Sequence, residues 1–288
     1  MRTITTIAEL RSVLGQRRAA GERVGFVPTM GYLHEGHLAL LRAARSANEC
    51  VVMSLFVNPL QFAAHEDLGT YPRDPEGDAS KAAAVGTDVL FAPEVSEMYP
   101  DGRDAVLTSV AVPALAAVME GASRPTHFAG VCTVVAKLFN LVGPCTAYFG
   151  EKDYQQLALI TRMAHDLSFP VEVVGCPTVR EPDGLALSSR NAYLSAQERA
   201  AAPVLHRALT AGAALIRAGQ SDRAVVLAAM EQVVTAEPLA ELDYLEIADP
   251  VTLAPQPVAG PDSRLFGAVR FSRARLIDNI AAVPGDDR

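Results

Sequence analysis

Short apolar runs alternate with segments of helical period through the first two-thirds of the chain. The runs have the length and composition of strands and span 23–29, 49–59, 88–93, 146–153 and 171–179, the fourth continuing into a loop. Apolar residues at helical spacing predict helices between them, at 36–48, 79–86, 126–143 and 153–167. Parallel strands need crossover connections of this kind, so the pattern predicts a doubly wound, Rossmann-like parallel α/β sheet.

The pattern changes after about residue 180. Two Ala-rich helical stretches are followed by two segments that alternate apolar and polar residues as antiparallel strands do. These four segments span 195–218, 221–236, 242–249 and 264–280. We therefore expect an N-terminal Rossmann-like domain over residues 1–182 and a smaller α+β domain over residues 183–288.

Composition and charge narrow the class of protein. With 50% apolar residues the chain can fill a sizeable core, and its net charge of -8 repels phosphate backbones, which argues against nucleic-acid binding. The four cysteines are widely spaced without a C-x-x-C pair, which indicates reduced, buried thiols. No stretch approaches the ~18 apolar residues of a membrane helix. We expect a cytoplasmic protein with no membrane partner.

The loop PTMGYLHEGH at 28–37 joins the first predicted strand to its helix, where open α/β sheets bind ligands. His34 and His37 are three residues apart at the helix start, so their rings can lie on one face. Free N–H groups and the helix dipole attract anions there, and Gly31 and Gly36 permit close backbone approach. We interpret the loop as a polyphosphate site whose imidazoles donate to transferring oxygens. The alternative is a surface turn whose histidines only cap the helix.

Two further loops carry groups that suit phosphate. Lys152, one of three lysines, lies in FGEKDYQQ at 149–156, where an ammonium can neutralise phosphate charge; the alternative is a solvated surface pair with Asp153. The segment DGLALSSRN at 183–191 joins two hydroxyls to a guanidinium, a combination that fits phosphate oxygens. An ordinary turn with serine caps is the alternative there.

Five motifs resemble those of one enzyme family. They are PTMGxLHxGH at 28–37, FVNPxQF at 56–62, RPTHFAGV at 124–131, FGEKDxQQ at 149–156 and SSRN at 188–191. Their order and spacing, together with the closing RLIDN, resemble the pantothenate synthetase (pantoate–β-alanine ligase) family. The H-x-G-H run alone is shared across the wider nucleotidyltransferase superfamily, but the five runs together are specific.

The resemblance implies an ATP-dependent ligase that condenses (R)-pantoate with β-alanine. In this family the pantoate carboxylate attacks the α-phosphate of ATP, giving pantoyl adenylate and diphosphate. The amine of β-alanine then displaces AMP to give pantothenate. The resemblance also implies Mg²⁺ bound mainly through the ATP phosphates, with no protein ligand to name, and a homodimer.

Position by position, the resemblance implies a catalytic group of His37 as proton donor, His34 as its partner near the phosphates, and Lys152 and Arg190 on phosphate oxygens. The 187–190 segment resembles a flexible signature loop that closes over the triphosphate. The implied ATP-binding residues are Met30, Gly31, Tyr32, Leu33, His34, Glu35, Gly36, His37, Gly150, Glu151, Lys152, Asp153, Val179, Leu187, Ser188, Ser189 and Arg190.

Gln61 and Gln156 are the residues that the resemblance implies for pantoate, and Gln61 also for β-alanine. An amide can donate to a carboxylate and accept from a hydroxyl, both of which pantoate carries. Taken without the family, each would be interpreted as a surface amide. Asn58 is a supporting neighbour, and Asp78 is a conceivable carboxylate on the magnesium side that we do not assign as a ligand.

Two other functions stay open at this point. One is another adenylyl- or cytidylyltransferase that shares the histidine loop, against which Gln61 and Gln156 argue because a phosphate-bearing acceptor would not call for them. The other is a nucleotide-binding module without turnover. A tRNA synthetase is disfavoured by the negative charge and by the lack of an anticodon-sized appendage.

Overall fold

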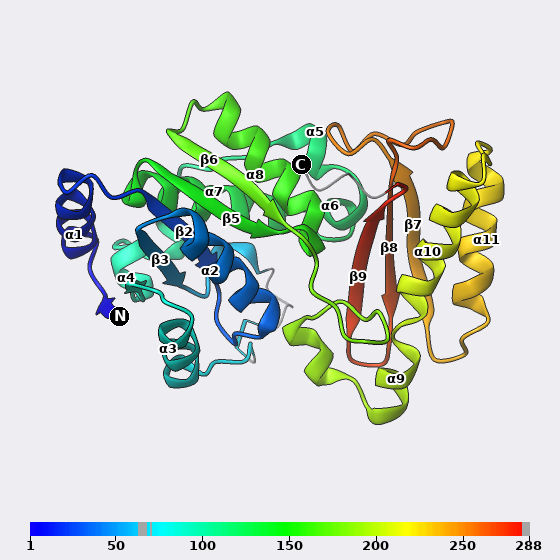
Figure 1. Ribbon diagram of the computed structural model, residues 1–288, viewed down its shortest axis with the longest axis horizontal. Coiled ribbons are helices and arrows are strands. Elements are labelled where there is room, and N and C mark those ends of the chain that lie inside the picture. The colour runs from blue at the N-terminus through cyan, green and yellow to red at the C-terminus, as the bar shows by residue number, and fades with distance from the viewer. Residues whose placement is uncertain (63–67, 70, 284–288) are drawn as a thin grey trace. The chain divides into compact units, whose positions relative to one another are not determined.

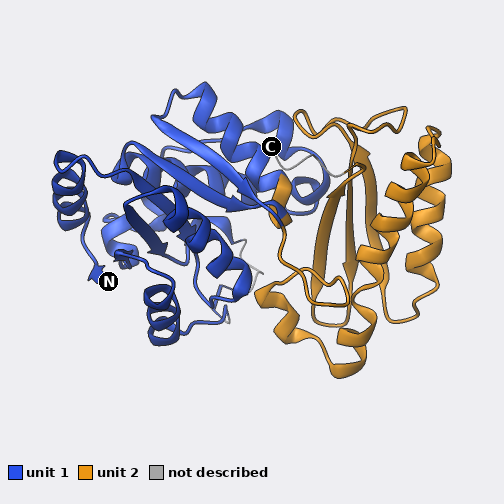
Figure 2. Ribbon diagram, viewed as in Figure 1, with its two compact units in different colours: residues 1–151, 155–177 blue, residues 152–154, 178–288 orange. Residues whose placement is uncertain are grey.

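The computed structural model describes residues 1–62, 68–69 and 71–283 (Figure 1). The chain forms two compact units (Figure 2). Unit 1 comprises Met1–Glu151 and Gln155–Pro177, and unit 2 comprises Lys152–Tyr154 and Thr178–Arg288. The domain boundary expected from the sequence, between residues 182 and 183, stays a prediction.

Unit 1 is built on a six-stranded sheet in which every neighbouring pair is parallel. The strand order is β1-β4-β3-β2-β5-β6. The strands are β1 (Arg2–Ile4), β2 (Val24–Thr29), β3 (Cys50–Leu55), β4 (Val89–Phe91), β5 (Cys145–Gly150) and β6 (Val171–Cys176). The doubly wound parallel sheet that the sequence predicts is confirmed, and its order reverses beside β2, where such sheets bind ligands.

The central strands explain why the apolar runs do not alternate. Five of the six residues of β2 and of β3 are buried, because helices cover both faces of a parallel sheet (Figure 1). The helices of unit 1 are α1 (Ile7–Ala19), α2 (Glu35–Ala47), α3 (Pro75–Ala84), α4 (Val95–Met98), α5 (Pro113–Ala116), α6 (Met119–Ser123), α7 (His127–Val142) and α8 (Tyr154–Asp166). In the described part of the chain, none of the helices combines the length and apolar content that crossing a membrane requires.

Unit 2 holds a separate antiparallel sheet of three strands in the order β7-β8-β9 (Figure 1). Its elements are α9 (Ala196–Ala201), α10 (Val204–Arg217), α11 (Arg223–Thr235), β7 (Glu241–Ala248), β8 (Arg264–Arg270) and β9 (Arg275–Ala281). One face of the sheet packs on α10 and α11 through a cluster that includes Leu209, Met230 and Leu265, all fully buried. The predicted α+β character of this part of the chain is confirmed.

Candidate functional site

The two imidazoles of the 28–37 loop are held as a pair at the start of α2. His34 is the N-cap residue, and its Nδ1 accepts a hydrogen bond from the Gly36 amide at 3.1 Å. The Nδ1 of His37 in turn accepts from the His34 amide at 3.3 Å, so the two side chains form a reciprocal capping box. Their ring centroids lie 4.2 Å apart. The expectation that both rings share one face is confirmed, and both also cap the helix.

This capping fixes the tautomer of each neutral imidazole ring. A nitrogen that accepts from a backbone N–H must offer a lone pair, so the proton of each neutral ring resides on Nε2. Each ring therefore presents an N–H donor on the side opposite its cap. Gly36 makes this arrangement possible, because a Cβ there would lie 2.9 Å from Cε1 of His34.

Asp78 on α3 holds the backbone that leads into this pair. Its side chain is 1% exposed, and its two oxygens accept hydrogen bonds from the amides of Tyr32 at 2.8 Å and Leu33 at 2.7 Å. Gly31 precedes these amides with a φ of +94°, and a Cβ there would lie 2.9 Å from Asp78 Oδ2. The carboxylate is thus a backbone anchor of the loop, a role that the sequence does not reveal.

Gln61 lies in a buried polar cluster, in the 3₁₀ turn Pro59–Gln61 that follows β3. Its side-chain nitrogen donates to the sulfur of Met30 at 2.9 Å, and its side-chain oxygen accepts from Asn58 at 3.2 Å. Asn58 also donates to the carbonyl of Gly130 on α7, while His127 Nδ1 lies 3.0 Å from the Gln61 carbonyl. The structure therefore brings Gln61 beside the Met30 end of the histidine loop, within unit 1.

The other predicted residues of unit 1 lie around the end of β5. Gly150 ends that strand, and Glu151 begins a 3₁₀ turn (Glu151–Asp153) that leads into α8. Gln156 is half-buried in the first turn of α8. Its neighbour Gln155 is buried and ties the α5–α6 connection through its side chain, bonding the carbonyls of Leu115 and Val118 at 2.8 Å each.

Lys152 belongs to unit 2, although it lies between two elements of unit 1 (Figure 2). Its Nζ lies 3.4 Å from Asp153, so the surface pair considered from the sequence is present. The Lys152 carbonyl accepts a hydrogen bond from the Asn279 side chain of β9 at 2.9 Å. Tyr154, two residues after Lys152, packs its ring against the guanidinium of Arg264, whose Cζ lies 3.6 Å from the ring centroid.

The segment that leads to Ser188 is a short hairpin of unit 2. Arg180 and Ala186 pair as an antiparallel bridge, and the Leu187 amide donates to the Val179 carbonyl at 3.0 Å. Ser188 then caps a 3₁₀ helix, Ser189–Tyr193, by accepting from the Arg190 amide at 3.3 Å. The serine cap considered from the sequence is present.

The predicted residues are divided between the two units. Unit 1 contains Met30, Gly31, Tyr32, Leu33, His34, Glu35, Gly36, His37, Gln61, Gly150, Glu151 and Gln156. Unit 2 contains Lys152, Asp153, Val179, Leu187, Ser188, Ser189 and Arg190. Sequence reasoning gave no anchoring role to Asp78, nor to Asp278 and Asn279, which bond Arg180 and the Lys152 carbonyl respectively. Asp278 and Asn279 stand in the RLIDN motif, which carried a resemblance but no role.

The cysteines are not candidates for the chemistry. All four are free; Cys50, Cys132 and Cys176 are buried as expected, whereas Cys145 is half-buried. Burial raises the pKa of Cys132 and of Cys176 to about 11, so neither is a thiolate near neutral pH. Among the described residues, no group of three imidazole, thiol or carboxylate side chains is arranged to hold a metal ion.

Comparison with known proteins gives a consistent family. A sequence model described as pantoate-beta-alanine ligase matches residues 2–281. The pantothenate synthetase of Sinorhizobium medicae is 52% identical over 289 residues, covering 100% of this chain and 98% of that protein. The pantothenate synthetase of Moorella thermoacetica is 52% identical over 286 residues, covering 99% and 100%.

Solved structures agree. The chain resembles a crystal structure of the Thermus thermophilus pantothenate synthetase with a TM-score of 0.93 and 55% identity, covering 99% of this chain and 100% of that one. A pantoate-beta-alanine ligase from Francisella tularensis, complexed with beta-gamma ATP and beta-alanine, gives a TM-score of 0.79 at 34% identity, with 99% of both chains covered.

Proposed function

The chain belongs to the pantoate-beta-alanine ligase family, and from that premise we propose that it condenses (R)-pantoate with β-alanine through a pantoyl adenylate. In the first half-reaction a carboxylate oxygen of pantoate bonds to the α-phosphorus of ATP while the bond to the β-phosphate breaks, releasing diphosphate. In the second the β-alanine nitrogen bonds to the acyl carbon, the bond from that carbon to the phosphate oxygen breaks, and AMP leaves. The amine loses a proton to give the neutral amide.

A free carboxylate is a poor acyl donor because its leaving group would be oxide. Adenylation replaces that leaving group with AMP, a phosphate ester that departs readily. No protein nucleophile takes part in either step. Catalysis then depends on positioning the reactants and stabilising charge on the phosphate oxygens. A site made of fixed hydrogen-bond donors suits this requirement.

The observation that carries the proposal is the His34–His37 capping pair. Because each Nδ1 is held by the backbone, each ring would act on the triphosphate through Nε2–H, at a helix N-terminus that itself attracts anions. His37 is proposed as the donor to the oxygens on which charge develops, with His34 beside it. The ATP-binding loop is proposed to run over 30–37.

The remaining phosphate contacts are proposed for unit 2. Lys152 offers a point charge, and Arg190 a planar fork of donors, to the phosphate oxygens. Ser188 and Ser189 add hydroxyl donors. The proposed ATP site is completed by Leu187, by Val179 through its backbone, and by Gly150, Glu151 and Asp153.

Pantoate is proposed to lie against Gln61 and Gln156. The Gln61 amide is a suitable ligand because its N–H donates to a thioether, a weak acceptor, which a carboxylate oxygen can replace at a gain. The adjacent Asn58 holds the Gln61 oxygen and so fixes the orientation of the amide. We propose that β-alanine also contacts Gln61.

Mg²⁺ is proposed to enter with ATP. Asp78, the buried carboxylate beside the loop, has both oxygens bonded to backbone amides, and we assign it the role of loop anchor and not of metal ligand. Phosphate oxygens and water are the ligands that Mg²⁺ ordinarily keeps, so no step is assigned to a protein-bound ion. The resemblance also supports a cytoplasmic location and a homodimer; sedimentation of the purified protein tests the dimer.

The test is a coupled assay for AMP with each substrate omitted in turn. AMP and diphosphate should form only when ATP, pantoate and β-alanine are all present. ATP turnover with another carboxylate or a nucleotide acceptor, and none with pantoate, would instead support a different nucleotidyltransferase. Calorimetric binding of ATP without any product would support a module that has lost turnover.

A further inference from the structure

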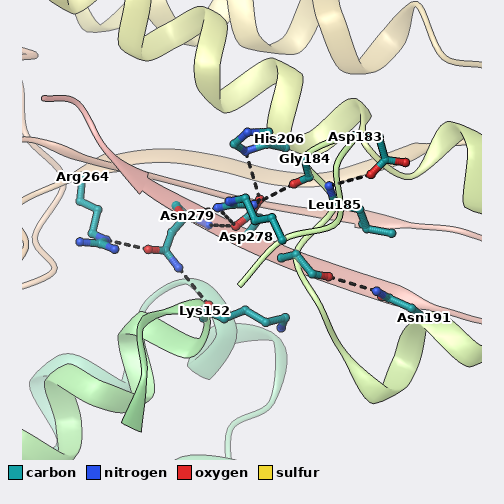
Figure 3. Close-up of polar contacts among 11 residues, drawn as sticks. Lys152, Asp183, Gly184, Leu185, Asn191, His206, Arg264, Asp278 and Asn279 are labelled. Atoms are coloured by element: carbon teal, nitrogen blue, oxygen red, sulfur yellow. Dashed lines mark hydrogen bonds and ion pairs between the residues drawn. The ribbon is translucent and has the colours of Figure 1, made fainter. Parts of the chain in front are cut away.

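Two neighbouring residues of β9 each hold a different part of the proposed phosphate site. Successive side chains of a strand point to opposite faces, and Asp278 and Asn279 do so in the small sheet of unit 2. His206 of α10 lies on the Asp278 side, and Lys152 on the Asn279 side (Figure 3). Both side chains are buried, with 5% and 3% exposed.

Asn279 fixes the main chain at Lys152. Its Nδ2 donates to the Lys152 carbonyl at 2.9 Å, and its Oδ1 accepts from Nε of Arg264 at 2.6 Å (Figure 3). The arginine can only donate, so the amide oxygen must face Arg264 and the amide nitrogen must face Lys152. The same guanidinium stacks on Tyr154, two residues further along. The peptide that carries the lysine is thus held at two points by unit 2.

Asp278 fixes the hairpin that leads to Ser188. Its two oxygens accept from the guanidinium of Arg180 at 2.6 and 2.9 Å, a bidentate pair. Arg180 also donates to the Gly184 carbonyl at 3.0 Å and pairs with Ala186 across the hairpin. The position of the hairpin is therefore set by the carboxylate of β9.

Packing alone does not account for these residues. A buried amide or carboxylate costs stability unless its hydrogen bonds are satisfied, and an apolar residue of similar size often serves a core as well or better. Here the Asn279 side chain bonds the Lys152 carbonyl and the Arg264 guanidinium that stacks on Tyr154. The polar groups of Asp278 and Asn279 bond two segments that the proposed function places at the ATP phosphates.

We propose that Asp278 and Asn279 are positioning residues for adenylation, with Asn279 aligning Lys152 and Asp278 aligning the 188–190 segment. The inference rests on the proposed function, in which both segments contact the phosphates. Neither residue contacts the reacting atoms, so each acts through the segment that it holds.

The test uses the full-length protein with near-isosteric variants. Asn279→Asp keeps the oxygen that Arg264 bonds but replaces the donor to Lys152 with an acceptor. Asp278→Asn keeps one acceptor for Arg180 and removes the charge. The matched control is Asp243→Asn, which weakens another half-buried carboxylate of this sheet, paired with Arg270 and Arg275 at 3.0 and 2.6 Å. Asn279→Ala serves if the aspartate variant does not fold.

Three quantities are measured: amide hydrogen exchange by mass spectrometry, the rate of each half-reaction, and Tm. Asn279→Asp should speed exchange at 152–155 but not at 184–190, and Asp278→Asn should do the reverse. Each should lower kcat for adenylate formation about 10–100-fold, as small misplacements of catalytic groups do. The KM for pantoate, and the reaction of preformed adenylate with β-alanine, should stay within about twofold of wild type. Asp243→Asn should lower Tm but leave hydrogen exchange at both segments and the rates of both half-reactions unchanged.

Each other outcome overturns the proposal. Unchanged exchange at 152–155 in the Asn279 variants would show that the amide does not hold the lysine segment. Faster exchange with normal adenylation would show that its position is unimportant, and equal loss in both half-reactions with a fall in Tm would show a purely structural role. If the wild-type protein makes no AMP from pantoate and β-alanine, the proposed function fails, while the exchange data still decide whether the two residues hold these segments.

Discussion

The anchor Asp78 offers a sharp perturbation, because a single side chain holds the turn before the histidine pair. Asp78→Asn preserves shape but leaves only one oxygen to accept from the amides of Tyr32 and Leu33, and its NH₂ group faces the other amide. A hydrogen bond to a charged group contributes about 1.5–3 kcal/mol. Loss of one of the two should therefore destabilise unit 1 by roughly that amount, and Asp78→Ala, which loses both, by about twice as much.

In a unit of this size, each kcal/mol lost from the free energy of unfolding lowers Tm by about 2–4 °C. The asparagine variant should thus lower Tm by about 3–12 °C, measured by differential scanning calorimetry near neutral pH. Adenylation should fall at least about 10-fold, because the backbone that places His34 and His37 loses an anchor.

Asp166→Asn is the control. Asp166 is the last residue of α8 and pairs with Arg162 one turn earlier, and both side chains are about half exposed. A surface ion pair contributes about 0–1 kcal/mol, so Tm and adenylation should hardly change. An Asp78→Asn protein with the Tm and activity of wild type would refute the assigned role of the carboxylate.

Other contacts of the site and of unit 2 are open to similar tests. His37→Ala should lower the adenylation rate about 10²–10³-fold with the fold intact; full activity in a stopped assay would show the imidazole to be incidental. Gly36→Ala should slow adenylation about 10-fold or more, because the new Cβ displaces the His34 ring; a crystal structure with the ring unmoved would contradict this. Hydrogen bonds from Ser272 and Ser195 lower the pKa of Glu198 from 4.5 to about 2. A carboxylate with a depressed pKa stabilises the fold above its unfolded pKa and loses this effect as pH falls, so Tm should drop more steeply between pH 4.5 and 2 in wild type than in Glu198→Gln.

The strands and long helices could be predicted where burial leaves a continuous signal. The apolar runs that became β2 and β3 are buried on both faces, so they stand out without alternation. By contrast, β1 is three residues long and buries only Ile4. The helix α1 was also missed, because only Leu10, Val13 and Leu14 are buried along it, although Thr6 caps it by accepting from the Glu9 amide, a recognisable start signal.

The site was predictable where its contacts are local. The spacing of His34 and His37 predicts that their rings can lie on one face, and the structure confirms it. Contacts between distant parts of the chain follow from the order of the strands, which no local pattern contains. Asp78 meets the Leu33 amide across 45 residues, and Asn279 meets the Lys152 carbonyl across 127.

The most direct test of the chemistry is isotope transfer from pantoate. Pantoate labelled with ¹⁸O in its carboxylate is incubated with ATP, β-alanine and the enzyme, and the nucleotide product is analysed by mass spectrometry. A pantoyl adenylate requires that one labelled oxygen leave with the phosphate, so AMP should carry a single ¹⁸O while diphosphate carries none. Label in inorganic phosphate with ADP as the nucleotide product, or unlabelled AMP, would contradict attack of the carboxylate on the α-phosphate.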